Sequence, residues 1–279
     1  MFPSFIVGLR EGLEAALIVG IIWAFLRRNG RSHEQAWIWL GVGLAVALCV
    51  FVAVGLRIAS NELPERQQMM LEAGISIVAV AFVTWMILWM RRHARDLKTS
   101  IEASAASALA TGSIGALVVM AFLAVLREGF ETAVFILAQF QETDRPLMTG
   151  AGAIIGLGVS VMIGVGIARG GMHINLARFF KVTGLLLVLI AAGLLAFAMH
   201  EVQELGWIGG EDVRALNLSW LAAEGTLRGA LVTGMFGIRA EPSLGEVLVW
   251  LAYAIPMSIV VLRPASVPKP PRPVAVSTA

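Results

Sequence analysis

Seven long apolar runs dominate the sequence and limit what the chain can fold into. They lie at about residues 2–26, 36–59, 68–90, 112–140, 148–169, 179–200 and 245–262. Each approaches or exceeds the roughly 20 mostly apolar residues that an α-helix needs to cross a bilayer. Backbone groups in lipid must be hydrogen-bonded within the protein, and a helix satisfies them within one segment. The sequence therefore predicts an all-α integral membrane protein with seven transmembrane helices.

The composition favours the same class of protein. The 279-residue chain is 58% hydrophobic and only 14% charged, whereas soluble domains have about 25% charged residues. The first run is too long for a cleaved signal peptide and lacks a basic start, so we expect it to be retained. The single cysteine, Cys49, excludes an internal disulfide and a cysteine-built metal site. The net charge of +2 does not indicate nucleic acid, because the basic residues gather in short loops.

Those basic loops alternate along the chain and predict its orientation. They follow the first, third, fifth and seventh runs, and contain Arg27, Arg28, Arg31, Arg91, Arg92, Arg95, Lys98, Arg169, Arg178, Lys181, Arg263, Lys269 and Arg272. The other connections carry proportionally more acid. Because Lys and Arg stay on the cytoplasmic side, we expect a multi-pass protein of the cell (inner) membrane. Its amino terminus should lie outside and its carboxyl terminus in the cytoplasm.

The expected domain plan is a seven-helix domain over residues 1–262 and a disordered, proline-rich cytoplasmic tail over 263–279. An outer loop over 201–244 separates the last two spans. Part of it, 213–236, is fairly apolar but contains Glu224 and Arg228. An eighth span there would place the basic tail outside, so short helices on the outer surface are expected instead.

Two runs carry the same charged motif at their centres. "LREGLEAALIVG" occupies residues 9–20 and "LREGFETAVFIL" occupies 126–137, an offset of 117. Each motif opens a set of three spans, and an odd number of spans reverses direction across the membrane. We therefore expect an inverted repeat of 3+3 helices, about 2–90 and 112–200, followed by the seventh helix over 245–262.

The motifs place four carboxylates at one depth. Glu11, Glu14, Glu128 and Glu131 each lie roughly 15 Å from the outer end of their span, at 1.5 Å per residue. Positions i, i+3 and i+4 share one face of a helix, so Arg10 and Arg127 accompany them as charge-compensating partners. Intramembrane charges are costly and mark functional sites. Oxygen-only ligands suit a hard metal cation, which these four glutamates are expected to bind.

Three other interpretations explain these charges less completely. A structural Arg–Glu pair would explain one motif, but not two at equal depth, and it leaves one glutamate per motif without a role. A membrane-embedded di-metal oxidoreductase would use Glu-x-x-His, and no such spacing occurs in the chain. A scaffold subunit would not need four matched glutamates. The tryptophans, including Trp85 and Trp89, are expected at the membrane interface, and Met86 as apolar filler.

The residues Arg10-Glu11-Gly12-Leu13-Glu14 and Arg127-Glu128-Gly129-Phe130-Glu131 resemble the signature of the oxidase-dependent iron permease family. This family includes fungal ferric permeases and bacterial EfeU-type iron transporters. The resemblance covers the chain to about residue 262. It implies a transporter, not an enzyme, that imports iron, expected as ferric iron after oxidation by a partner. A periplasmic iron-binding protein and a peroxidase or oxidase are implied partners, and no cofactor is built in. Another cation, such as manganese or lead, remains an alternative.

Acidic residues at outer span ends suggest a second, collecting site. Glu62 and Glu65 form one E-x-x-E pair, and Glu201 and Glu204 form another beside His200. These side chains could gather cations before they reach the midplane. Scattered acidic residues are also common on solvated surfaces, so both interpretations stay open.

Overall fold

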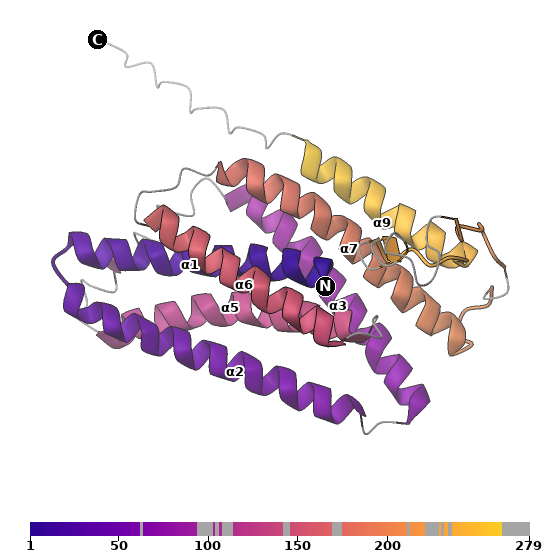
Figure 1. Cartoon of the computed structure of the whole chain (residues 1–279), viewed down its shortest axis with the longest axis horizontal. Coiled ribbons are helices and arrows are strands. Elements are labelled where there is room, and N and C mark those ends of the chain that lie inside the picture. The colour runs from indigo at the N-terminus through magenta and orange to yellow at the C-terminus, as the bar shows by residue number, and fades with distance from the viewer. Residues whose placement is uncertain are drawn as a thin grey trace, which may run out of the picture.

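The computed structural model describes residues 1–61, 64–93, 103, 106–107, 114–141, 146–168, 175–210, 213–220, 229, 232–233 and 236–263. Within these residues the chain is a bundle of seven long α-helices (Figure 1), which confirms the predicted class. The helices are α1 (Phe2–Arg28), α2 (Gln35–Asn61), α3 (Glu65–His93), α5 (Ile114–Gln141), α6 (Pro146–Ala168), α7 (Leu176–Glu204) and α9 (Leu244–Leu262). A short 3₁₀ turn, η1 (Ser32–Glu34), joins α1 to α2. Each helix coincides with one predicted run to within a few residues.

Length and composition support a membrane-spanning bundle. Helices α2, α3, α6, α7 and α9 are long and apolar enough to cross a membrane. Helices α1 and α5 have 27 and 28 residues. Each differs from the other five in carrying an arginine and two glutamates near its middle. The charged motifs therefore stand on the two helices that most need protein around them.

Local sequence signals define several helix ends. Helix α1 ends before Gly30, whose φ of 72° is a left-handed conformation that suits glycine. The Oδ1 atom of Asn175 accepts a hydrogen bond of 3.0 Å from the Arg178 backbone and caps α7. The Oγ atom of Ser243 accepts a hydrogen bond from the Glu246 backbone and caps α9. These caps stabilise the starts of α7 and α9.

Helix α7 forms the centre of the bundle. In its most apolar stretch 67% of the residues are buried, against 22% in α2 and in α9. It packs mainly on α3 and α9. Its Leu187 and Leu194 join Val83 of α3 and Phe135 of α5 in the main apolar core. Helices α2, α6 and α9 therefore lie at the periphery.

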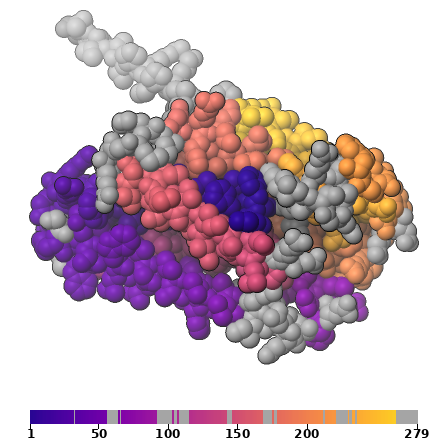
Figure 2. Space-filling view, in the orientation of Figure 1, coloured from indigo at the N-terminus to yellow at the C-terminus, as the bar shows by residue number. Residues whose placement is uncertain are grey.

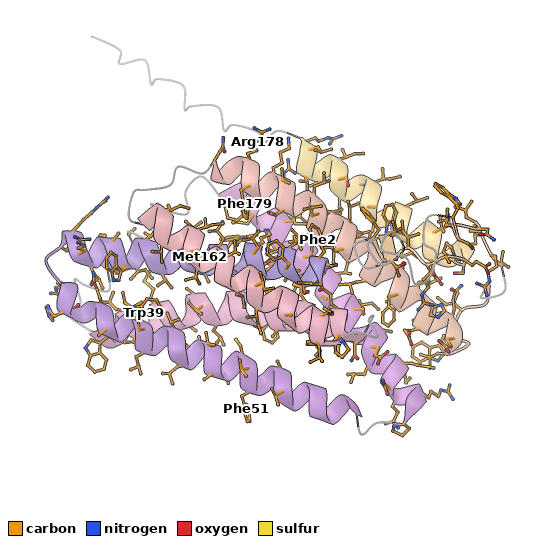
Figure 3. All side chains as sticks on the ribbon, viewed as in Figure 1. Phe2, Trp39, Phe51, Met162, Arg178 and Phe179 are labelled. Carbon is orange, nitrogen blue, oxygen red and sulfur yellow. The ribbon has the colours of Figure 1, made fainter. Side chains whose placement is uncertain are left out.

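The peripheral helices present apolar side chains outward. Trp39 and Phe51 project from α2 and Met162 lies on α6 (Figure 3), each more than half exposed. A soluble protein rarely exposes so large an apolar surface. Lipid contact explains this surface.

Helices α1 and α6 approach each other very closely through glycines. A Cβ atom on Gly152 would overlap the Met1 carbonyl and the Ser4 side chain, and one on Gly156 would overlap the Phe5 carbonyl. Gly152 and Gly156 have the small-xxx-small spacing that permits such a close approach. Figure 2 shows the first residues of the chain (indigo) lying against α6 (rose). This contact holds the first motif firmly inside the bundle.

The predicted outer loop is shorter than expected, because α7 continues to Glu204. Within the segment once considered for an eighth span, residues 213–220 are not helical, and Leu218 donates a backbone hydrogen bond to Ala240. The rest of that segment is described only at isolated positions. The predicted disordered tail lies, except for Arg263, outside the described residues.

Candidate metal site

In α1 the motif arginine lies between its two glutamates. Arg10 Nη1 is 2.8 Å from Glu11 Oε1, and Arg10 Nη2 is 3.1 Å from Glu14 Oε1. The second contact follows from the i, i+4 spacing, which stacks residues on one helix face. Arg10 is only 1% exposed, so these are fully desolvated charges that require each other.

In α5 the same spacing gives a related but looser arrangement. Arg127 Nε lies 3.2 Å from Glu131 Oε1 and 3.8 Å from Glu128 Oε1. The Arg127 side chain is 32% exposed, whereas both glutamates are buried. The two motifs are therefore not equivalent in their surroundings, although their sequences match.

Helices α1 and α5 pack against each other, and their motifs converge. One carboxylate oxygen from each of Glu11, Glu128 and Glu131 lies within 4.8 Å of the other two. The Oε2 atoms of all three glutamates are buried without a hydrogen-bond partner among the described residues. Buried carboxylate oxygens need such partners or a cation. The arrangement could hold a metal ion through one oxygen from each side chain.

Glu14 does not belong to this group of three. It is 4% exposed and lies beside Arg10 on the same helix. The sequence predicted four carboxylates at one level; oxygens of three of them lie within 4.8 Å of one another, and Glu14 interacts electrostatically with Glu128 and Glu131 without an oxygen in that group. Four carboxylates and two guanidinium groups would leave a net negative charge, which a cation would balance.

Three partners of the arginines were not identified from the sequence. Arg10 Nη1 donates to Met86 Sδ at 2.7 Å. The Arg127 guanidinium carbon lies 4.9 Å and 4.5 Å from the ring centroids of Trp85 and Trp89. All three partners belong to α3. The expectation that these residues are apolar filler or interface anchors was therefore incomplete.

The glycine within each motif lets a neighbouring helix approach. A Cβ on Gly12 would overlap Ser160 of α6, and a Cβ on Gly129 would lie 2.7 Å from Cys49 Sγ of α2. A side chain at either position would push the second helix away. The glycine of R-E-G-x-E thus has a packing reason at both sites.

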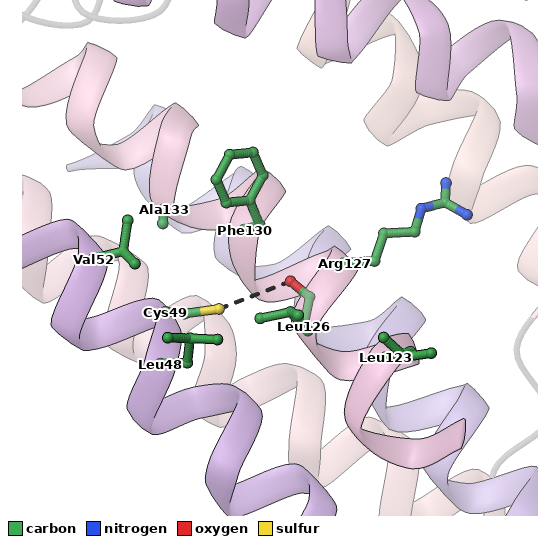
Figure 4. Close-up of a pocket in the computed structure, with 8 residues that line it drawn as sticks. All are labelled: Leu48, Cys49, Val52, Leu123, Leu126, Arg127, Phe130 and Ala133. Carbon is green, nitrogen blue, oxygen red and sulfur yellow. Dashed lines mark hydrogen bonds between the residues drawn. The ribbon is translucent and has the colours of Figure 1, made fainter. Parts of the chain in front are cut away.

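A separate apolar pocket of about 410 Å³ lies between α2 and α5 (Figure 4). Of the described residues that line it, the only charged one is Arg127, whose side chain points away from Cys49 in the figure. The Cys49 thiol contacts the Leu126 carbonyl at 3.8 Å. With a cation and no carboxylate in its lining, this pocket is not a metal site.

The predicted outer collecting residues are described only in part. Glu62 and the side chain of Glu65 lie outside the described residues. His200 lies 3.0 Å from Glu246 of α9 and 3.6 Å from Glu204 of α7. Glu201 is 7% exposed and interacts electrostatically with His200 and Arg239.

The outer cluster also contains acids that the E-x-x-E pattern did not reveal. Glu201 interacts electrostatically with Glu204 and with Glu72 of α3. Glu72 accepts a hydrogen bond of 2.8 Å from Gln68. Glu72 and Glu246 are single acids near the ends of their helices, so only their positions in the fold connect them to α7.

A helical membrane bundle with a buried triad of carboxylates between two crossed helices defines a multi-pass membrane protein with a candidate cation site. Comparison with known proteins identifies the class further. The chain belongs to the iron permease FTR1 family, whose family model matches residues 1–268. It is therefore a transporter, and the di-metal oxidoreductase alternative is excluded. No solved structure gives a significant match.

Bacterial relatives match over nearly the full length. The ferrous iron permease EfeU of Escherichia coli O6:K15:H31 is 39% identical over 267 residues, which cover 95% of this chain and 96% of the relative. That of Escherichia coli O157:H7 gives the same values. That of Yersinia pestis is 38% identical and covers 95% of this chain and 94% of the relative. The resemblance suggested by the two motifs is confirmed.

Proposed function

We propose that the chain imports iron across the bacterial inner membrane, and that Glu11, Glu128 and Glu131 bind the ion on its way. The observation that carries this proposal is the convergence of three buried carboxylates from two helices within 4.8 Å, each with an oxygen that has no hydrogen-bond partner in the described part of the chain. Membership of an iron permease family supports iron as the ion. Arg10 and Arg127 neutralise part of the charge when no ion is bound.

The ligand chemistry supports ferric iron as the transported ion. An all-carboxylate site has hard oxygen donors and a high negative charge, which favour a small, highly charged cation such as ferric iron. The relatives bear the name ferrous iron permease. Both facts fit if ferrous iron is delivered outside and is oxidised by a partner protein before transport.

The direct experiment is uptake of radiolabelled iron into proteoliposomes that contain the purified protein. Ferric iron, kept soluble by a weak chelator, should enter faster than ferrous iron kept reduced by ascorbate. Manganese and lead, added in excess, should compete weakly. Absence of protein-dependent uptake of both iron species would contradict the proposed function. Stronger uptake of manganese or lead than of iron would show that the transported ion is not iron.

We also infer that residues 2–90 and 112–200 form an inverted repeat. The packing of the helices supports this: α1 packs on α6 and α5 packs on α2, so the first helix of each unit packs on the second helix of the other. The two first helices, α1 and α5, also pack together, as do the third helices, α3 and α7. A two-fold relation between the units would generate all four contacts. It would place the site on the axis, as in other transporters built from repeats.

Membrane orientation gives a simple prediction. A reporter fused after residue 270 should be cytoplasmic, and one inserted at Gly210 should be external, because the arginine-rich connections belong inside. Gly210 lies in an exposed turn with a φ of 103°, so an insertion there should not disturb a helix. Accessibility of the two reporters in intact cells measures the orientation. An external carboxyl-terminal reporter would contradict it and revive an eighth span.

The acidic cluster beside His200 is proposed as a collecting site. Glu201 and Glu204 should concentrate cations electrostatically, so Glu201→Gln/Glu204→Gln is expected to raise the apparent KM for iron about ten-fold while keeping some transport. The difference from the wild type should shrink at high salt, since the charge of the exposed Glu204 is screened. Uptake at several ionic strengths measures both effects. Glu241→Gln, at an exposed pair with Arg214, is the matched control. An unchanged apparent KM for iron would contradict a collecting role for these acidic residues.

A further inference from the structure

Both motif arginines share their carboxylate partners with the candidate metal site. Arg10 pairs with Glu11, and Arg127 pairs with Glu131. Glu11 and Glu131 are two of the three carboxylates that converge. An ion that binds there must therefore compete with both guanidinium groups for negative charge. The other contacts of each guanidinium determine whether it stays in place when an ion binds its carboxylate partner.

Besides the second glutamate of its own motif, each guanidinium has uncharged partners, and these all come from α3. On α3, Trp85 and Trp89 are four residues apart and so share one face, and both rings lie within 5 Å of the Arg127 guanidinium carbon. Met86, the next residue after Trp85, accepts a hydrogen bond from Arg10. Indole rings and a thioether attract a guanidinium, but they are poor ligands for a hard cation.

A contact between two aromatic rings fixes α3 against α5 at the level of the second motif. Phe82 of α3 and Phe130 of α5 stack edge to face, with ring centroids 5.7 Å apart. Phe130 belongs to the second motif. This contact holds the face of α3 that contains Trp85 and Trp89 against Arg127. The Nη2 atom of Arg127 is buried without a hydrogen-bond partner among the described residues, which makes the ring contacts its main remaining support.

We propose that α3 holds the arginines of both motifs in place, Arg127 through Trp85 and Trp89 and Arg10 through Met86. Each guanidinium then stays beside the site after iron takes its carboxylate partner. This inference rests on the proposed function and adds three positioning residues to it. Without α3 contacts, each arginine would pair more completely with its glutamate and would exclude iron more strongly.

The first test is the kinetics of iron uptake in Trp85→Leu/Trp89→Leu. We expect the apparent KM to rise about ten-fold, as two cation–π contacts of ordinary strength would give, with the maximal rate per protein retained. Trp85→Phe/Trp89→Phe should show a smaller rise because phenylalanine is a weaker cation–π partner. Met86→Leu, which keeps the volume and loses the acceptor, should raise the KM several-fold. A purely structural role would lower the amount of protein and leave the KM unchanged.

The second test is spectroscopic and uses gallium(III) as a redox-inert analogue of ferric iron. Its binding should change the tryptophan emission of the wild type, because the Arg127 guanidinium that lies over the two rings loses its Glu131 partner when that carboxylate takes the metal. The change should disappear in Trp85→Phe/Trp89→Phe. It should persist in Trp39→Phe, which alters an exposed ring on the outer face of α2.

The outcomes separate this inference from the proposed function. Normal uptake by Glu131→Gln would overturn the function itself. Loss of uptake in Glu131→Gln, combined with wild-type KM in the α3 variants and an undiminished emission change in Trp85→Phe/Trp89→Phe, would overturn only the role of α3. If the leucine variant does not accumulate, the phenylalanine variant decides by the same two measurements.

Discussion

Glutamine in place of Glu11, Glu128 or Glu131 is expected to abolish iron uptake while the protein still accumulates in the membrane. Glutamine keeps the shape of the side chain and one carbonyl oxygen, but it removes the charge that a hard cation requires. Loss of residues that merely orient a metal ligand costs about 10- to 100-fold in affinity or activity. We therefore expect a loss of roughly 100-fold or more for the ligands themselves. Uptake of radiolabelled iron, divided by the amount of protein, measures it.

Two further glutamine variants sharpen this prediction. Glu14→Gln should lose less activity, because Glu14 lies beside Arg10 and outside the group of three. Glu34→Gln alters a buried glutamate that pairs with Arg31 at 3.2 Å, away from both motifs, and should transport normally. If Glu11→Gln is inactive while Glu128→Gln and Glu131→Gln transport normally, the shared site is wrong. The second motif would then have only a structural role.

Arg10→Ala is expected to reduce both membrane accumulation and uptake. The guanidinium is 1% exposed and compensates two buried carboxylates. Removing one partner of a buried ion pair costs about 3–5 kcal/mol, which is a large part of the stability of a typical protein. Quantitative immunoblotting of membranes and a thermal unfolding assay measure the loss. Arg10→Lys should recover part of it, because the charge remains but the two-pronged contact does not.

An exposed ion pair provides the control for this arginine. Arg214 lies 3.3 Å from Glu241, and both side chains are largely exposed. Exposed pairs contribute about 0–1 kcal/mol, so Arg214→Ala should accumulate like the wild type. Wild-type accumulation and transport by Arg10→Ala would show that the buried carboxylates do not depend on the arginine.

Much of the fold could be predicted because lipid imposes strong constraints on a sequence. An apolar run of about 20 residues has few alternatives to a spanning helix, and each predicted run is one helix. The charged motifs on α1 and α5 could also be recognised from the sequence, because charged residues such as Arg10 and Glu11 within an apolar run need a functional explanation. The i, i+4 spacing correctly predicted the pairs that Arg10 makes with Glu14 and Arg127 makes with Glu131.

The finer features depend on contacts between helices, which no local pattern encodes. Spacing within a motif could not show that an oxygen of Glu11 joins those of Glu128 and Glu131 while Glu14 lies outside this group. A tryptophan on an apolar helix looks the same whether it faces lipid or a guanidinium, so the roles of Trp85 and Trp89 were missed. Glu246 joins His200 only because α9 packs on α7.

Equilibrium binding of radiolabelled iron to the purified protein tests most directly whether one ion is shared by the two motifs. The measurement is best made in a Glu201→Gln/Glu204→Gln background, which removes the outer cluster. The parent should bind one ion per chain. Adding Glu11→Gln on α1 or Glu131→Gln on α5 should each remove that ion, and adding Glu34→Gln should not. Retention of the full ion with either Glu11→Gln or Glu131→Gln would contradict a site built jointly by α1 and α5.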